Sequence, residues 1–311
     1  MAMSIRFGAR STADQVLAGI DLSGRRIVVT GCNSGIGFET MSALAANGAQ
    51  VIGLARSFEI ARVACAKAGA SCIPVACDLS DLASVAAAAE TIRALRVPLD
   101  AIVANAGIAN LPTLQTRYGV EMQFLVNHVG HFALINRIQG LVRDGTGRIV
   151  IVSSSAALQQ APPEGIHFDN LDGHRSYEPS AFYGQSKLAN ALFAKELSRR
   201  LSNRGIAVNS LHPGATRGTR LNKHLARPLK ILLSVARWFM KSAPRGAATQ
   251  ALLAANPSVA GISGEFWANC RIAKGSPLLE DGVLARRLWQ VSEEIVARHG
   301  LAPDHSLQEA A

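Results

Sequence analysis

Tyr183 and Lys187 lie four residues apart at the start of a long helical stretch, so their side chains share one face of the helix. A phenol has an unperturbed pKa of about 10, and a neighbouring ammonium group favours the phenolate and lowers that pKa. Such a pair could exchange a proton with a substrate oxygen near neutral pH. Taken alone, the spacing is equally typical of an amphipathic surface pair.

Three consecutive serines, 153–155, follow an apolar strand-like run, and any of their hydroxyls could hydrogen-bond a reacting oxygen. The position relative to the strand favours Ser154, although serine-rich strand ends are also common without a catalytic role. Hydrolysis is disfavoured because no serine lies in a G-x-S-x-G turn. The histidines at 128, 131 and 212 lack the spacing of metal ligands, so we interpret them as structural and expect no metal site.

A glycine-rich turn joins the first strand-like run to a helical one. Glycine permits the tight turn and lets backbone N–H groups approach a diphosphate, while the helix N-terminus adds favourable partial charge. A turn without a ligand is the alternative, but the position between strand and helix favours dinucleotide binding. The residues predicted to contact the cofactor here are Gly31, Asn33, Ser34, Gly35, Ile36 and Gly37.

Arg56 follows the second strand, where a fold that prefers NAD places an acidic residue against the ribose hydroxyls. A guanidinium at this position can pair with a 2′-phosphate, so we expect NADP(H), with NAD(H) disfavoured. The alternative is a surface arginine on a loop. Farther along, Asp78 and Leu79 could border the adenine or begin the next helix. Asn105, Ala106 and Gly107 end the fourth strand with small residues that suit either close approach of a ligand or a plain turn.

Apolar strand-like runs alternate with helical ones along the whole chain, which is the pattern of a βαβ fold. Because the strand runs are apolar throughout, we expect helices on both faces. The sequence therefore predicts an α/β class with one doubly wound Rossmann-type domain over residues 1–311 and a mostly parallel sheet of seven strands. The predicted strands are 26–30, 50–55, 71–76, 101–105, 148–153, 207–212 and 265–268, and the predicted helices are 36–47, 59–68, 82–94, 119–142, 181–202, 244–255 and 283–299.

Two segments, 158–180 and 215–243, do not follow this alternation, and both come after strands whose ends should border the ligand crevice. The second mixes apolar and basic residues at 229–240. It is predicted to be a substrate lid, with a packed helix or a membrane-surface helix as alternatives. Residues 302–311 are predicted to be a disordered tail.

The net charge of +10 does not concentrate on one element, so nucleic-acid binding is not expected. The five cysteines form no C-x-x-C pair and favour free thiols in a reducing compartment. No apolar run reaches the length of a transmembrane helix, and no leader is recognised at the N-terminus. We therefore expect a cytoplasmic protein.

These motifs together resemble the short-chain dehydrogenase/reductase family, over almost the whole chain. T-G-x-x-x-G-x-G, N-A-G, the serine after strand five, Y-x-x-x-K and Pro213-Gly214 occur in the order of that family. A finer resemblance is to its retinol dehydrogenases and to the oxidoreductase domain of the WW-domain-containing oxidoreductases. It rests on residues 12–16, 126–132, 168–171, 183–190 and 288–289.

The resemblance implies an alcohol or carbonyl oxidoreductase acting on a small lipophilic substrate such as a retinoid, a steroid, an aromatic compound or a secondary metabolite. It implies Tyr183 as general acid/base, Ser154 as the group that orients the carbonyl, and Lys187 as ribose contact and activator of the phenol. Asn127 would hold a proton-relay water. It also implies cofactor contacts from Asn105 to Gly107 and from Pro213 and Gly214 together with Thr216 or Thr219, because this turn is one residue longer than in relatives.

The substrate, the oligomeric state and the presence of turnover are left open by the sequence. The substrate is open because residues 217–241, where substrate preference usually resides in the family, match poorly, and because the membrane anchor of many retinol-active relatives is missing from this sequence. The long helices after strands four and five could pair subunits into a homodimer or homotetramer, or the chain could be a monomer. An NADP(H)-binding regulatory or scaffold protein without turnover is the alternative function, and the complete set of serine, tyrosine and lysine disfavours it.

Overall fold

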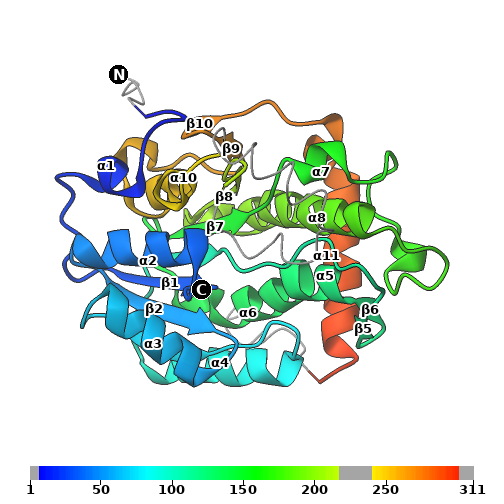
Figure 1. Ribbon diagram of the computed structural model, residues 1–311, viewed down its shortest axis with the longest axis horizontal. Helices are drawn as coiled ribbons and strands as arrows, with labels where there is room; N and C mark the ends of the chain where they lie inside the picture. The colour runs from blue at the N-terminus through cyan, green and yellow to red at the C-terminus, as the bar shows by residue number, and fades with distance from the viewer. Residues whose placement is uncertain (1–6, 217–239, 301–311) are drawn as a thin grey trace.

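A mostly parallel sheet forms the centre of the protein, with helices on both of its faces (Figure 1). This computed structural model describes residues 7–216 and 240–300. Within them, eight strands follow the order β10, β9, β8, β7, β4, β1, β2 and β3. They are β1 (Arg26–Thr30), β2 (Gln50–Ala55), β3 (Ile73–Ala76), β4 (Ala101–Ala104), β7 (Arg148–Val152), β8 (Ala207–His212), β9 (Phe266–Ala268) and β10 (Arg271–Ile272).

The predicted doubly wound α/β architecture is confirmed, with one strand more than the seven expected. The extra strand, β10, pairs antiparallel with β9 through a turn at Asn269 and Cys270, both of which have positive φ. A two-residue strand is too short to leave a periodic signal in the sequence. β3 also starts later than predicted, since the backbone N–H of Cys72 donates to Gly69 in a turn instead of joining the sheet.

Successive residues of each central strand point into different layers of the core. In β1, Ile27 and Val29 pack into one apolar cluster while Val28 packs into the other. This alternation follows from the period of two of a β-strand, and burial on both faces explains why the strands are apolar throughout.

One face of the sheet is covered by α1, α2, α3 and α10, and the other by α4, α5, α6, α8 and α11. α1 was not predicted; it is a single short helix whose Thr12 and Gln15 form a reciprocal capping box. α11 crosses α8 and packs against it at the right of Figure 1. The bounds are α1 (Ala13–Leu17), α2 (Gly35–Ala46), α3 (Phe58–Ala68), α4 (Leu82–Ala94), α5 (Met122–Phe124), α6 (Gly130–Ile138), α7 (Ala156–Gln159), α8 (Pro179–Arg200), α10 (Ala243–Ala255) and α11 (Gly282–Ala297).

The helix predicted over 119–142 is interrupted in two ways. Its start is replaced by a hairpin, β5 (Thr116–Arg117) and β6 (Val120–Glu121), whose turn residues Tyr118 and Gly119 both have positive φ. The Glu121 carboxylate then caps α5. A π-helical turn at Leu125–Val129 separates α5 from α6, and such insertions often occur at functional sites.

The chain reverses its direction of travel across the sheet between β1 and β4. β1 leads outward to β2 and β3, whereas β4 leads to β7 and β8 on the other side. In open α/β sheets the crevice outside the carboxyl ends of the strands at such a switch point binds ligands. The residues that follow β1 and β4 are therefore expected to border a ligand-binding crevice.

Candidate active site

A cavity of about 810 Å³ opens at this switch point. Its wall combines residues that follow β1, β2, β3, β4, β7 and β8, which are far apart in the sequence. Nearly all predicted site residues of the described ranges contribute to it: Gly31, Asn33, Ser34, Gly35, Ile36, Gly37, Arg56, Asp78, Leu79, Asn105, Ala106, Gly107, Ser154, Tyr183, Lys187, Pro213, Gly214 and Thr216.

The glycine-rich turn is packed so closely that side chains are excluded from it. A Cβ atom on Gly37 would lie 2.3 Å from the carbonyl oxygen of Gly31 and 2.4 Å from Nδ2 of Asn105. Ser34, the N-cap of α2, makes no side-chain capping hydrogen bond, so its side chain does not occupy the first N–H groups of the helix. This arrangement fits a diphosphate, which backbone N–H groups at a helix N-terminus can bind.

The hydroxyl of Thr30 joins the ends of β1 and β4. It accepts hydrogen bonds from the backbone N–H groups of Asn105 at 2.9 Å and Ala106 at 3.0 Å. The Asn105 side-chain amide donates to the carbonyl oxygen of Thr30, also at 2.9 Å. The segment 105–107 is thus locked against the glycine-rich turn, which favours close approach of a ligand over a plain turn. Sequence reasoning did not single out Thr30.

Arg56 is exposed at the end of β2 and lines the cavity. No hydrogen bond or ion pair of its guanidinium occurs among residues 7–216 and 240–300, so the group is available to a ligand. Asp78 forms a local turn by accepting from the backbone and side chain of Ser80 at 2.9 and 2.7 Å. The N-cap of α4 is Asp81, not Asp78, and Leu79 is buried beside Asp78 at the cavity wall.

The three serines after β7 have different environments. The Ser153 hydroxyl is buried and donates to the carbonyl oxygen of Lys187 at 2.6 Å, which fastens β7 to α8. The backbone N–H of Ser155 donates to Nδ1 of His212. Ser154 is partly exposed, and its hydroxyl hydrogen-bonds the Tyr183 side chain and thereby acts to lower the pKa of that phenol. The geometry thus favours Ser154 among the three.

Tyr183 and Lys187 lie on the buried face of α8, one turn apart, with the Lys187 ammonium nitrogen 6.0 Å from the centre of the phenol ring. Burial raises the pKa of Tyr183 despite the hydrogen bond from Ser154. Burial also lowers the pKa of Lys187 to about 8. The expectation of a lowered Tyr183 pKa is therefore wrong for the protein without its cofactor, because desolvation outweighs the hydrogen bond from Ser154.

Asn127 lies in the middle of the π-helical turn and holds the loop after β4. Its side chain accepts from the Ile108 N–H at 2.8 Å and donates to the Ile108 carbonyl oxygen at 2.9 Å. It also donates to Ser186 at 2.9 Å. A Cβ atom on Gly107 would lie 3.1 Å from Oδ1 of Asn127 and 3.2 Å from the Lys187 nitrogen, so a glycine at 107 allows these groups to converge.

The turn after β8 completes the cavity. Thr216 is buried and its hydroxyl donates to the carbonyl oxygen of Gly214 at 3.0 Å, whereas Thr219 lies outside the described residues. The predicted lid over 215–243 and the tail over 302–311 also lie largely or wholly outside them. His212, interpreted as structural from the sequence, lines the cavity, and burial lowers its pKa to about 4.

The apolar part of the wall was not predicted. Ile108, Ala109, Leu111, Met122 and Val126 line the cavity, and Ala109 packs against Tyr183. Residues 108–111 could have been found from the sequence, because they follow a predicted strand end. Nothing in the sequence indicated that the start of α5 also borders the cavity.

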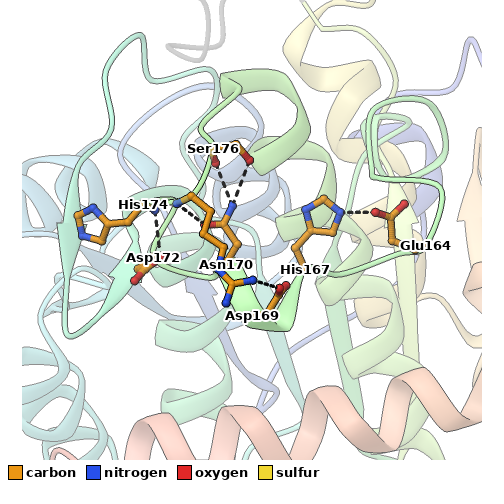
Figure 2. Close-up of polar contacts among 8 residues, drawn as sticks. Glu164, His167, Asp169, Asn170, Asp172, His174 and Ser176 are labelled. Atoms are coloured by element: carbon orange, nitrogen blue, oxygen red, sulfur yellow. Dashed lines mark hydrogen bonds and ion pairs between the residues drawn. The ribbon is translucent and has the colours of Figure 1, made fainter.

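The connection between β7 and α8 carries its own set of polar contacts (Figure 2). Asn170 is buried, donates to the carbonyl oxygen of Ser176 at 2.9 Å, and accepts from the backbone N–H of Arg175 at 3.0 Å. Toward the surface, Arg175 pairs with Asp169, and His167 contacts Glu164 at 2.6 Å. These contacts fold the segment on itself beside the N-terminus of α8, which carries Tyr183.

Comparison with known proteins identifies the family. The family model for short chain dehydrogenase matches residues 25–167. Human retinol dehydrogenase 14 is 36% identical over 296 residues, which cover 88% of this chain and 87% of that protein. The chain belongs to the short-chain dehydrogenase/reductase family. The WW domain-containing oxidoreductase of Danio rerio is another relative, 36% identical over 96% of this chain and 74% of its own length.

Solved short-chain dehydrogenase/reductase structures share the fold. An uncharacterised protein from Mycobacterium paratuberculosis superimposes with a TM-score of 0.73 at 29% identity, covering 91% of this chain and 97% of the other. An angucycline C-6 ketoreductase with bound NADP gives a TM-score of 0.62 at 27% identity, covering 79% and 94%.

As a short-chain dehydrogenase/reductase, the chain is an oxidoreductase that interconverts alcohols and carbonyl compounds with a nicotinamide cofactor. The residues of the cavity fit such a cofactor: the glycine-rich turn offers backbone donors, and the end of β2 offers the Arg56 cation, which has no partner within the described part of the chain. Among the described residues, no helix is both long and apolar enough to cross a membrane.

Proposed function

We propose that this enzyme uses NADP(H) to interconvert an alcohol and a ketone or aldehyde on a small lipophilic substrate, with Tyr183 transferring the proton. The single observation that carries this proposal is the cavity in which Ser154, Tyr183 and Lys187 meet the glycine-rich turn. Bound nicotinamide would supply or accept the hydride in this cavity.

Tyr183 would donate its hydroxyl proton to the carbonyl oxygen during reduction and recover it during oxidation. Ser154, which already hydrogen-bonds the phenol, would donate to the same oxygen and hold it in place. Lys187 would contact the cofactor ribose and favour loss of the phenol proton. An anionic cofactor nearby favours the charged form of this buried amine, whose pKa is about 8 in the protein alone. Asn127 would hold a relay water between Lys187 and solvent.

The preference for NADP(H) rests on the unpaired guanidinium of Arg56. A 2′-phosphate beside it would gain charge-assisted hydrogen bonds, whereas the two ribose hydroxyls of NAD(H) would have no carboxylate at this strand end. Asp78 and Leu79, next along the cavity, would border the adenine. The bound NADP of the ketoreductase neighbour supports the same choice.

The substrate class rests on the wall next to Tyr183. Residues 108–111 offer mainly apolar side chains, and Met122 and Val126 extend this surface. Such a wall favours retinoid, steroid, aromatic or secondary-metabolite alcohols and ketones over sugars. The name of the relative retinol dehydrogenase 14 points in the same direction.

We further propose a cytoplasmic location, supported by five cysteines that are all free thiols. Cell fractionation would test it. For assembly, α11 packs across α8, so this part of α8 is already covered within one chain. A homodimer or homotetramer would therefore have to use another face, and light scattering of the purified protein would distinguish these states from a monomer.

The test is a screen of aldehydes, ketosteroids and aromatic ketones that follows NADPH absorbance. We expect turnover of at least one class, and Tyr183→Phe should reduce kcat by about 1,000-fold or more while the dissociation constant of NADPH stays within about threefold. Tight NADPH binding without turnover of any compound would instead indicate a cofactor-sensing protein. Substantial activity of Tyr183→Phe would remove the phenol from the mechanism.

A further inference from the structure

Two buried histidines, His128 and His131, lie three residues apart at the π-helical turn, and both are fully inaccessible. Their partners differ. His128 contacts the hydroxyl of Ser292 on α11 at 2.8 Å, on the side away from the cavity. His131 contacts the hydroxyl of Thr30 at 2.8 Å and the carbonyl oxygen of Asn127 at 2.9 Å, so it touches two parts of the site.

The hydrogen bonds around Thr30 determine which ring nitrogen of His131 carries the hydrogen. The Thr30 oxygen already accepts from the N–H groups of Asn105 and Ala106, so its two lone pairs are used and its own proton is left to donate. The acceptor of that proton is Nε2 of His131. The ring must then carry its hydrogen on Nδ1, which donates to the carbonyl oxygen of Asn127.

His128 is in the opposite tautomer. The Ser292 hydroxyl donates to the carbonyl oxygen of Leu288 at 2.7 Å, so it can only accept from the ring, and Nε2 of His128 carries the hydrogen. Burial lowers the pKa of both imidazoles, to about 3 for His128 and about 4 for His131. Both rings are therefore neutral at physiological pH, and the two tautomers persist.

We propose that His131 is a positioning residue of the enzyme, which connects the cofactor turn to the π-helical turn through its two ring nitrogens. Nε2 keeps the Thr30 hydroxyl aimed so that it can hold the backbone of residues 105–106. Nδ1–H holds the backbone of Asn127, whose side chain anchors Ile108 and lies beside Gly107 and Lys187. The proposal rests on the proposed roles of Asn127 and Lys187 in the reaction.

Two substitutions test the two ring nitrogens one at a time. His131→Gln places a polar atom near the position of Nε2 and loses the hydrogen-bond donor to the Asn127 carbonyl oxygen. His131→Asn places a polar atom near the position of Nδ1 and loses the acceptor for the Thr30 hydroxyl. We expect His131→Gln to lower kcat about tenfold with little change in NADPH affinity. His131→Asn should weaken NADPH binding about tenfold with a smaller change in kcat. His131→Phe should show both effects.

The matched control is His128→Phe, a buried histidine of the same turn with its partner on α11. It should lower the melting temperature as much as His131→Phe while kcat and NADPH affinity stay within about twofold of the wild type. If the His131 variants lose only thermal stability, as this control does, His131 is merely structural and the proposal is wrong.

A double-mutant cycle that combines His131→Asn with Thr30→Val gives a second test. Because both single changes break the same hydrogen bond, the loss of NADPH affinity in the double variant should be no larger than in the worse single variant. Fully additive losses would overturn the proposed connection. If the wild type binds NADPH but reduces no carbonyl, the proposed function is refuted. The proposal for His131 is still decided in that case, because the NADPH affinities of its variants can be measured.

Discussion

The two halves of the crevice are built in different ways. The cofactor half consists of backbone segments at the ends of β1 and β4, locked together by the Thr30 hydroxyl and closed by contacts that a single methyl group would break. The other half consists mainly of apolar side chains, and segment 158–180, which contributes Gln160 to the wall, is held both by polar contacts within itself (Figure 2) and by the Tyr177 hydroxyl, which donates to the carbonyl oxygen of Leu111. Residues in the first half should therefore tolerate less change than residues in the second.

The largest effect on cofactor binding is expected at Gly37. In Gly37→Ala the new methyl group meets the Gly31 carbonyl oxygen and the Asn105 amide, so the turn must move away from its ligand position. We expect NADPH affinity to fall by about 100-fold or more, measured by fluorescence titration. Gly8→Ala, where a methyl group meets nothing within 4 Å, serves as control and should bind normally. Normal binding by Gly37→Ala would show that the turn is not a tight cradle.

A smaller change is expected at the edge of the cofactor half. Arg56→Asp should shift the ratio of kcat/KM for NADPH over NADH toward NADH by about 10- to 100-fold, because a cation for the 2′-phosphate is replaced by an acceptor for hydroxyls. Arg62→Asp makes the same change in charge on the exposed surface of α3 and should leave the ratio nearly unaltered. Equal shifts in both variants would attribute the effect to overall charge rather than to a site.

Lys187, at the junction of the two halves, should make stability depend on pH. Its pKa is about 8 in the folded cofactor-free protein and 10.5 ordinarily, so between these values the unfolded chain binds the proton and the folded one does not. The free energy of unfolding should therefore rise with pH over this range, by about 2 kcal/mol up to pH 10.

Urea unfolding at pH 8 and about pH 10 measures this gain, which should be missing in Lys187→Met. Lys195→Met, on an exposed face of the same helix, should behave like the wild type. A gain that persists without Lys187 would assign the pH dependence to other groups.

The smallest effects belong to segment 158–180. Asn170→Ala removes the amide that joins residues 175 and 176, and should lower the free energy of unfolding by about 1 kcal/mol and raise the KM of the carbonyl substrate a few-fold. Arg175→Ala removes only an exposed ion pair with Asp169 and should change stability by less than about 0.5 kcal/mol. If Arg175→Ala lowers the free energy of unfolding more than Asn170→Ala does, the exposed ion pair holds the segment more strongly than the buried amide.

The same contrast explains what could be predicted from the sequence. The cofactor half depends on glycines at fixed spacing and on positions that follow apolar strands, so its residues are visible as a pattern, and the cavity brings them together. The class of the fold and most helices and strands follow from the same periodicity. β10, the β5–β6 hairpin and α1 are too short for a periodic signal, and nothing in the sequence indicated the π-helical turn.

The pKa of Tyr183 was predicted with the wrong sign because burial cannot be read from the spacing of two residues. The contacts of Thr30 and His131 and the position of His212 in the cavity wall were not predicted for a similar reason. Their partners are distant in the sequence: the Thr30 hydroxyl is 75 residues from Asn105 and 101 residues from His131. Only the arrangement of β1 beside β4 makes these side chains neighbours.

The shared hydroxyl of Thr30 has a consequence for redesign of this scaffold. One oxygen atom links the loops on the two sides of the sheet reversal, so neither loop can be exchanged for that of a homologue without altering the hydrogen bonds of the other. Grafting experiments should move 30–37 and 105–108 as one cassette together with the imidazole at 131. Segment 158–180 lies outside this cassette, but Tyr177 donates to the carbonyl oxygen of Leu111, so a replacement made for a new substrate has to keep that contact.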